Sequence, residues 1–197
     1  MTAARPYHHG HLRDALLDAA ERSVEEQGAQ QLSLRELART VGVSHAAPRS
    51  HFPDRQALLD ALAERGFDRL AAMLRQADEA AGPGFEARLR AVATAFVAFA
   101  VRSPTLLDLM YVGRRGDDAP MPLQVAMADT FAVVRRLIHD GIAGDVLAPG
   151  IPERYAFLLF AWVRGIAALV AGDILDPDAS DELIGDAVTT FIRGSAA

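Results

Sequence analysis

Arginine and histidine side chains collect in two stretches of the chain that contain no acidic residue, residues 1–13 and residues 37–53. Guanidinium groups bind phosphate oxygens through paired hydrogen bonds. A local basic surface matters more for such binding than the charge of the whole chain. Nucleic acid is therefore a candidate partner, although the net charge is −6. The basic and imidazole residues of the two stretches are Arg5, His8, His9, His11, Arg13, Arg39, His45, Arg49 and His51.

No catalytic motif accompanies these residues. The sequence has no cysteine, and it contains neither a glycine-rich phosphate loop, nor an HExxH motif, nor a serine–histidine–aspartate arrangement. We therefore expect a protein that is not an enzyme and that needs no cofactor. His8, His9 and His11 could chelate a metal ion, but no carboxylate or thiol accompanies them to fix its geometry. An arm that crosses a DNA backbone is the favoured interpretation, and no metal site is predicted.

Residues 34–52 have the pattern of two short helices joined by a tight turn. Apolar residues recur at helical spacing before Gly42, which suits the left-handed residue that ends a helix. Ser33 with Glu36 has the form of a capping box, and Ser44 suits the N-cap of a second helix. Helix, short turn and helix is the helix-turn-helix pattern. Neither helix is long enough to be stable alone, so other helices must hold the pair.

The remainder of the chain is predicted to be helical as well, because no stretch alternates with a period of two. We therefore expect an all-α protein with two parts. Residues 1–55 are expected to form a three-helix unit that contains the helix-turn-helix, and residues 56–197 a helical bundle. The chain lacks the apolar leader of a signal peptide, which favours a cytoplasmic location. The predicted helices cover residues 12–27, 34–41, 45–52, 55–79, 85–101, 104–110, 122–142, 155–175 and 180–193.

The segment 155–175 is apolar on all sides, which is typical of a membrane span or of a helix buried against protein. Arg164 near its middle would cost about 2.5–3.5 kcal/mol on insertion into a bilayer. Small residues from Ala161 to Gly172 allow another helix to approach closely. The favoured interpretation is a homodimer in which the last two helices of each protomer form a four-helix bundle, without a membrane.

At this point the residues resemble a known family, the TetR/AcrR family of one-component transcriptional repressors. The similarity is most specific in Leu32–Ala38, Val41–Ser44 and His51–Leu59. Residues 7–13 are similar to the lead-in of one large branch of that family. This branch carries a Trp-x-x-x-His-Gly motif in its ligand-binding half. The matching run here is 160–165, with Phe160 in place of Trp and Arg164 in place of His.

The resemblance implies how the chain binds DNA. Arg35 matches a position that contacts a base, and bidentate bonding to guanine is the chemistry that would explain it. His51 and Arg55 match phosphate-contacting positions. Arg49-Ser50 stands where the family has a tyrosine followed by a variable residue, and Arg49 could replace the tyrosine's phosphate bond with a charge-assisted one. The implied DNA-binding residues are Arg35, Ser44, His45, Ala46, Ala47, Arg49, Ser50, His51 and Arg55.

The resemblance also implies that residues 1–55 are the DNA-binding domain and that residues 56–197 are a ligand-binding and dimerisation domain with a small-molecule pocket. It hence implies a repressor that an effector releases from DNA. Aromatic and methionine residues at helical spacing are often plain core, so each of them could touch a ligand or only fill the core. A helical protein without a DNA-binding role, either membrane-associated or structural, is the alternative function. The candidate ligand-binding residues are Phe96, Phe99, Met110, Tyr111, Phe131, Trp162 and Arg164.

Overall fold

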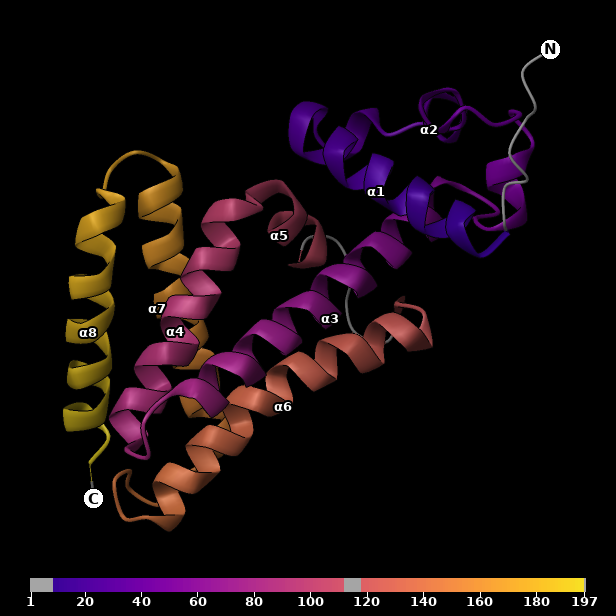
Figure 1. Ribbon diagram of the computed structural model, residues 1–197. Helices are drawn as coiled ribbons and strands as arrows, with labels where there is room; N and C mark the ends of the chain where they lie inside the picture. The colour runs from indigo at the N-terminus through magenta and orange to yellow at the C-terminus, as the bar shows by residue number, and fades with distance from the viewer. Residues whose placement is uncertain (1–8, 112–117, 197) are drawn as a thin grey trace. The chain divides into compact units, whose positions relative to one another are not determined.

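The structure is a computed structural model that describes residues 9–111 and 118–196, and within these ranges every regular element is helical (Figure 1). The predicted all-α class is confirmed. Two of the elements, η1 and η2, are single 3₁₀ turns. In chain order the elements are α1 (His9–Gln27), η1 (Ala29–Gln31), α2 (Leu34–Val41), η2 (Ala47–Ser50), α3 (Arg55–Ala80), α4 (Phe85–Arg102), α5 (Pro104–Tyr111), α6 (Met121–Ala143), α7 (Pro152–Ala171) and α8 (Pro177–Gly194).

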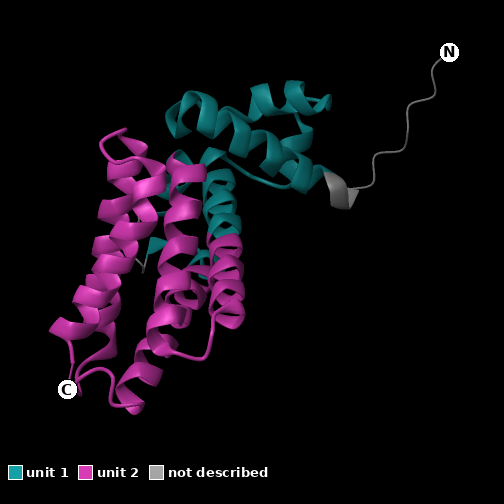
Figure 2. Ribbon diagram, turned by 60° about the vertical axis from the view of Figure 1, so that its left-hand side comes forward, with its two compact units in different colours: residues 1–66, 105–123 teal, residues 67–104, 124–197 magenta. Residues whose placement is uncertain are grey.

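The helices divide into two compact units (Figure 2). Unit 1 comprises residues 1–66 and 105–123, and unit 2 comprises residues 67–104 and 124–197. The first part of α3 therefore belongs to unit 1 and the rest of it to unit 2. This division into compact units does not test the domain boundary that the sequence predicts at residue 55, and that boundary stays a prediction.

Unit 1 is built on the apolar stripe of α1. Leu16, Ala20 and Val24 lie on that stripe and are fully buried. α1 packs against η1 and α2, and α2 packs against η2. Each large apolar side chain that is buried in this way contributes about 1.5–3 kcal/mol, which is the stabilisation that the eight-residue α2 lacks by itself. Other core residues of this unit are Leu12, Leu17, Leu37, Ala38, Phe52, Leu58 and Leu62.

Unit 2 is organised around α4, which packs against both α7 and α8, while α7 and α8 also pack against each other. α4 begins after the Gly82-Pro83-Gly84 break, which the sequence marks as the end of the preceding helix. Its buried side chains lie at helical spacing, so one face of the helix fills the unit's interior. The largest fully buried side chains of unit 2 are Phe67, Leu70, Leu74, Phe99, Leu137 and Ile138.

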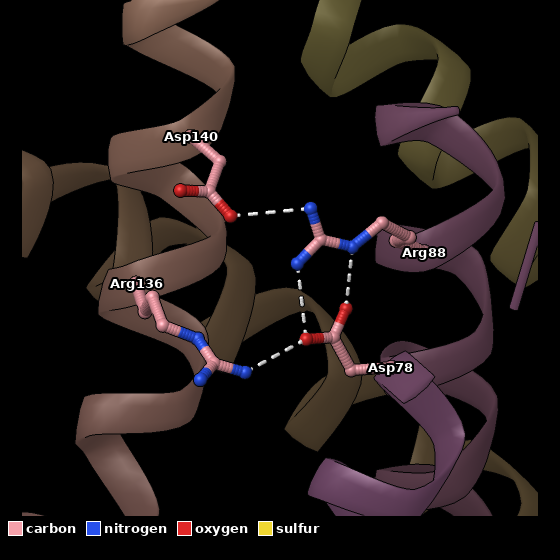
Figure 3. A network of polar contacts seen from close by, with 4 residues as sticks. All are labelled: Asp78, Arg88, Arg136 and Asp140. Carbon is pink, nitrogen blue, oxygen red and sulfur yellow. Dashed lines mark hydrogen bonds and ion pairs between the residues drawn. The ribbon is translucent and has the colours of Figure 1, made fainter. Parts of the chain in front are cut away.

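Four charged side chains of unit 2 join α3, α4 and α6 (Figure 3). Asp78 is 5% exposed and accepts hydrogen bonds from Arg88 Nε at 2.7 Å and Nη2 at 3.0 Å. It also accepts one from Arg136 Nη2 at 3.1 Å, and Arg88 Nη1 donates to Asp140 at 3.1 Å. The hydrogen bond from Arg88 lowers the pKa of Asp78 below 3.8 and outweighs burial, which acts in the opposite direction. Asp78 is therefore held ionised.

The last two helices differ in extent from the prediction. α7 begins at Pro152 rather than at residue 155, because proline is tolerated in the first turn of a helix, where its missing amide is not needed. It ends at Ala171 rather than at residue 175, because Gly172 caps it and Asp173 turns left-handed with φ 54°. α8 begins at Pro177 rather than at residue 180. Asp176 caps it by accepting the amide of Asp178 at 2.8 Å.

Among the described residues, α7 is the one helix long and apolar enough by itself to cross a membrane, with a mean hydropathy of 1.5. α4 and α5 pass the same test only as a pair, and they are bent by 105° with respect to each other. Only 28% of the apolar window of α7 is buried, so much of this helix presents an apolar face that the single chain does not cover.

Candidate nucleic-acid interface

The turn after α2 is set by a single glycine. Gly42 is left-handed with φ 78° and ψ 32°, and the amide of Val43 donates to the carbonyl of Ala38 at 2.9 Å. This end of α2 is confirmed as predicted. The capping box at its start is wrong. Ser33 has the extended backbone of an N-cap, but its side chain makes no capping hydrogen bond.

The second helix of the predicted helix-turn-helix is the 3₁₀ turn η2, and this corrects the α-helix expected over residues 45–52. Pro48 explains the difference, because it has no amide proton to give to the carbonyl of Ser44 in an α-helical bond. The amide of Ala47 bonds the Ser44 carbonyl instead, at 3.0 Å, and the amide of Arg49 bonds Ala46 at 3.2 Å. Both bonds span three residues, as in a 3₁₀ helix. Ser44 therefore caps no α-helix.

The side chains of this segment separate into a buried and an exposed set. Pro48 is buried and His51 is half-buried, and the Nε2 atom of His51 is covered without a hydrogen-bond partner among the described residues. Ala47 is half-buried. The predicted DNA-contacting residues that are exposed are Arg35, Ser44, His45, Ala46, Arg49 and Ser50.

Two of the predicted contacts have partners inside the protein. Arg55 donates from Nε to the carbonyl of Leu32 at 3.1 Å, and from Nη2 to the carbonyl of Ala29. Its guanidinium thus closes the turn between α1 and α2. The hydroxyl of Ser50 donates to the carbonyl of Ala47 at 2.7 Å, within its own 3₁₀ turn. Arg35 and Arg49 make no hydrogen bond, ion pair or ring contact within residues 9–111 and 118–196.

The first part of α3 is fixed to α1 by a forked ion pair. Arg65 donates from Nη1 to Asp18 at 2.6 Å and from Nη2 to Glu21 at 2.7 Å. The side chain of Arg65 is 30% exposed, so water weakens the attraction, but two bonds from one planar group still define the orientation of the helices. The exposed basic surface of α2 and η2 is therefore carried on a braced three-helix unit.

The predicted ligand-binding residues fall into separate places. In unit 2, Phe96 contacts Phe160 at 5.8 Å between ring centroids, and Phe131 contacts the same ring at 5.7 Å. Trp162 belongs to another cluster, where it meets Phe191 edge-on at 6.1 Å. Phe160 is the central ring, and reasoning from the sequence left it out although it stands at the motif's tryptophan position. Phe99 is buried in the core of unit 2, and Arg164 is half-buried.

Met110 and Tyr111 lie at the end of α5 in unit 1. Met110 lines an open cleft of about 640 Å³ within this unit, formed mainly by the first turns of α3 and by α5. The walls include Arg55 and Asp60 from α3 and Asp108 from α5. Tyr111 is half-buried and is not among the lining residues.

Comparison with known proteins decides the family. Residues 16–62 match the model described as "Bacterial regulatory proteins, tetR family", and residues 89–191 match "Tetracyclin repressor-like, C-terminal domain". The chain belongs to the TetR family of bacterial transcriptional regulators. It therefore carries a helix-turn-helix DNA-binding domain, and it is not an enzyme.

Solved structures agree with the TetR fold. A protein of unknown function from Rhodococcus sp. RHA1 is 45% identical, with a TM-score of 0.89 over 98% of this chain and 100% of that one. A TetR-family transcription regulator from Marinobacter aquaeolei VT8 is 17% identical, with a TM-score of 0.75 over 94% and 95% of the two chains. The fatty acid degradation regulator FadR from Bacillus halodurans is 14% identical, with a TM-score of 0.73 over 92% and 98%. No protein of curated function matches the chain.

Within this TetR-family unit, two further exposed arginines lie outside the set of residues predicted to contact DNA. Arg13 of α1 places its guanidinium carbon 5.7 Å from the ring centroid of Phe52, which follows η2 in the chain. Arg39 is exposed on α2, the helix that packs against η2. The signal was present in the sequence, because both residues lie in the acid-free stretches.

Proposed function

We propose that this TetR-family regulator is a repressor that binds a pseudo-palindromic DNA operator as a homodimer and leaves it when a small molecule binds the C-terminal half. Residues 1–55 would supply the DNA-binding domain and residues 56–197 the ligand-binding and dimerisation domain. Such a protein acts where the chromosome is, in the cytoplasm. The observation that carries the proposal is the unpaired basic surface of α2 and η2.

That surface is suited to the grooves and phosphates of duplex DNA. Arg35, Arg39 and Arg49 are exposed, and no acidic partner neutralises them within the described part of the chain. The helix-turn-helix places its second element in the major groove, where side chains reach base edges. Arg35 would contact a base from α2, while His51 and Arg55 would face phosphates. Ser44, His45, Ala46 and Ala47 would lie along the groove.

The homodimer is supported by the uncovered face of α7. Leu158, Trp162 and Leu169 are 52%, 37% and 37% exposed, and Gly165 lies on the same stripe, at positions three or four residues apart. Such a face is covered when α7 and α8 of one protomer pack against those of a second copy. A two-fold dimer of this kind matches a palindromic operator with half-sites about 34–36 Å apart.

The effector site is supported by the aromatic side chains of the second half. Phe96, Phe131 and Phe160 form a connected set of rings, and Arg164 is close to them in sequence. A ligand pocket is commonly lined by aromatic residues with a few polar groups that fix orientation. Ligand binding would release DNA only if the ligand prefers the conformer that binds DNA poorly, and a complete switch needs about 5.5 kcal/mol of preference.

The proposal is tested by selecting bound DNA from a random pool with the purified protein at a stated salt concentration. We expect one palindromic sequence to be enriched. Arg35→Ala should weaken binding to that sequence by about 1–3 kcal/mol and relax the preference at one base pair in each half-site. If no palindrome is enriched, binding to a pseudo-palindromic operator as a homodimer is refuted. If Arg35→Ala weakens binding to all sequences equally, Arg35 contacts only phosphate.

A further inference from the structure

The 3₁₀ geometry of η2 determines which side chains line its exposed face. In a 3₁₀ helix, residues three apart lie directly above one another. The amide of Arg49 donates to the carbonyl of Ala46 at 3.2 Å, so Arg49 stands one turn above Ala46, and both are exposed. Pro48 is buried on the other side of the turn. The exposed edge of η2 therefore carries one long side chain over a methyl group.

The other polar groups of the segment are less available. The hydroxyl of Ser50 is turned back to the carbonyl of Ala47 at 2.7 Å. The Nε2 atom of His51 is covered by protein. His45 is exposed, but an imidazole ring cannot present two parallel donors to one base. Arg49 offers a fork of several donors.

The guanidinium of Arg49 is also not engaged elsewhere. Arg55 donates hydrogen bonds to two backbone carbonyls, and the guanidinium of Arg13 lies over the ring of Phe52. Arg49 makes no such contact with any described part of the chain. Its fork can therefore meet a new partner without breaking an existing bond.

We propose that Arg49 reads a guanine in each half-site of the operator, in a role distinct from the tyrosine that the family carries at this position. This inference rests on the proposed DNA-binding function. A guanidinium fork matches the O6 and N7 acceptors of guanine in the major groove. The methyl group of Ala46 below it leaves room for the base edge and suits contact with a thymine methyl. The half-site should therefore contain a guanine next to a thymine.

A phosphate contact by Arg49 is the rival role, and it has a different signature. Phosphate contacts weaken binding to all sequences alike when they are removed, and each one lowers the salt slope by about one unit. A guanine contact instead changes the preferred base at one position and depends on the N7 atom. Substituting 7-deazaguanine removes that acceptor and leaves the base pair intact.

The test compares the wild type, Arg49→Ala and a control, Arg39→Ala, in selection from a random pool and in binding to the enriched site. We expect the wild type to enrich a guanine that Arg49→Ala no longer prefers and that Arg39→Ala still does. 7-Deazaguanine at that position should weaken the wild type about ten-fold and leave Arg49→Ala unchanged. Equal sequence preferences for wild type and Arg49→Ala would overturn the inference. Failure of the wild type to enrich any sequence would instead refute the proposed function. Circular dichroism melting confirms that both variants are folded.

Discussion

The carboxylate of Glu25 on α1 accepts a hydrogen bond at 3.0 Å from the backbone amide of Leu106, in the first turn of α5. The first amides of a helix have no partner within the helix, and an acceptor from elsewhere must satisfy them. A side chain 81 residues away in sequence performs this function here. α5 is therefore fastened at its start to the helix that supports the DNA-binding surface.

Replacing Glu25 with alanine should lower the free energy of unfolding by about 1–2 kcal/mol, because the Leu106 amide would lose its acceptor. Glu25→Gln should restore most of the loss, since the amide oxygen still accepts. Urea unfolding measures both variants. Glu26→Ala is the matched control, because Glu26 is exposed beside it and has no hydrogen bond within the described residues. Equal losses for Glu25→Ala and Glu26→Ala would contradict the capping role.

Arg55 should have two separable roles. Its bonds to the carbonyls of Leu32 and Ala29 hold the turn before α2, so Arg55→Ala should lower the free energy of unfolding by about 1–3 kcal/mol. If Arg55 also faces a phosphate, the salt slope of DNA binding should fall by about one unit per protomer. Binding titrations at several salt concentrations measure this slope. A loss of stability without a change in the salt slope would show that Arg55 stabilises the fold and does not contact a phosphate.

Asp78 should make the protein sensitive to acid. Its pKa is lowered in the folded state, so its contribution to stability is complete above the ordinary value of 3.8 and is lost as the pH falls through the lower folded value. Asp78→Asn should therefore be less stable at neutral pH and lose less stability below about pH 4 than the wild type. Urea midpoints from pH 2 to pH 7 measure the difference. Parallel pH profiles for the two proteins would refute this account.

The two arginines that bond Asp78, Arg88 and Arg136, should differ in how much each contributes to the stability of the fold. Arg88 bonds both carboxylate oxygens and also Asp140, whereas Arg136 makes one bond and its side chain is 59% exposed. Removing one partner of a buried ion pair costs about 3–5 kcal/mol, and an exposed one costs about 0–1 kcal/mol. Arg88→Ala should therefore unfold at a clearly lower temperature than Arg136→Ala. The reverse order would show that the network is arranged differently in solution.

The proposed dimer interface on α7 predicts how a substitution at Gly165 affects assembly. A Cβ atom at Gly165 would meet nothing within 4 Å in its own chain, so a larger side chain is tolerated in the folded protomer. Gly165→Leu should still fold but shift the dimer to monomers, because it fills the space needed by the second copy. Sedimentation analysis measures the assembly, with Ala87→Leu, on the exposed start of α4, as the control. A Gly165→Leu dimer of unchanged stability would exclude this face.

Local signals in the sequence predicted most of the element boundaries. Gly42 ends α2 and Asp54 caps α3, accepting the amide of Ala57 at 2.8 Å, because glycine and aspartate act through their own backbone neighbourhood. Pro48 carried an equally local signal, and the prediction underestimated it. A missing amide at the fourth residue of a short helix is enough to give 3₁₀ bonding.

Contacts between distant residues could not be predicted in this way. Nothing near Glu25 shows that its carboxylate reaches Leu106, and nothing near Asp78 shows that Arg136 lies beside it. Such pairs depend on how helices pack, which local sequence patterns do not reveal. The aromatic residues were named at the right spacing, but spacing alone could not tell that Phe131 meets Phe160 while Trp162 meets Phe191.

The shortness of η2 limits how many base pairs a single protomer can distinguish. Four residues rising about 2.0 Å each extend only about 8 Å, while successive base pairs are about 3.4 Å apart. One copy of the segment therefore faces only about two or three base pairs. A sequence of only two or three base pairs recurs by chance throughout any genome. In the proposed homodimer, selectivity for a particular gene would come from two such short sequences that are bound together at a fixed separation. Loss of dimerisation would then remove selectivity even where contact with DNA survives.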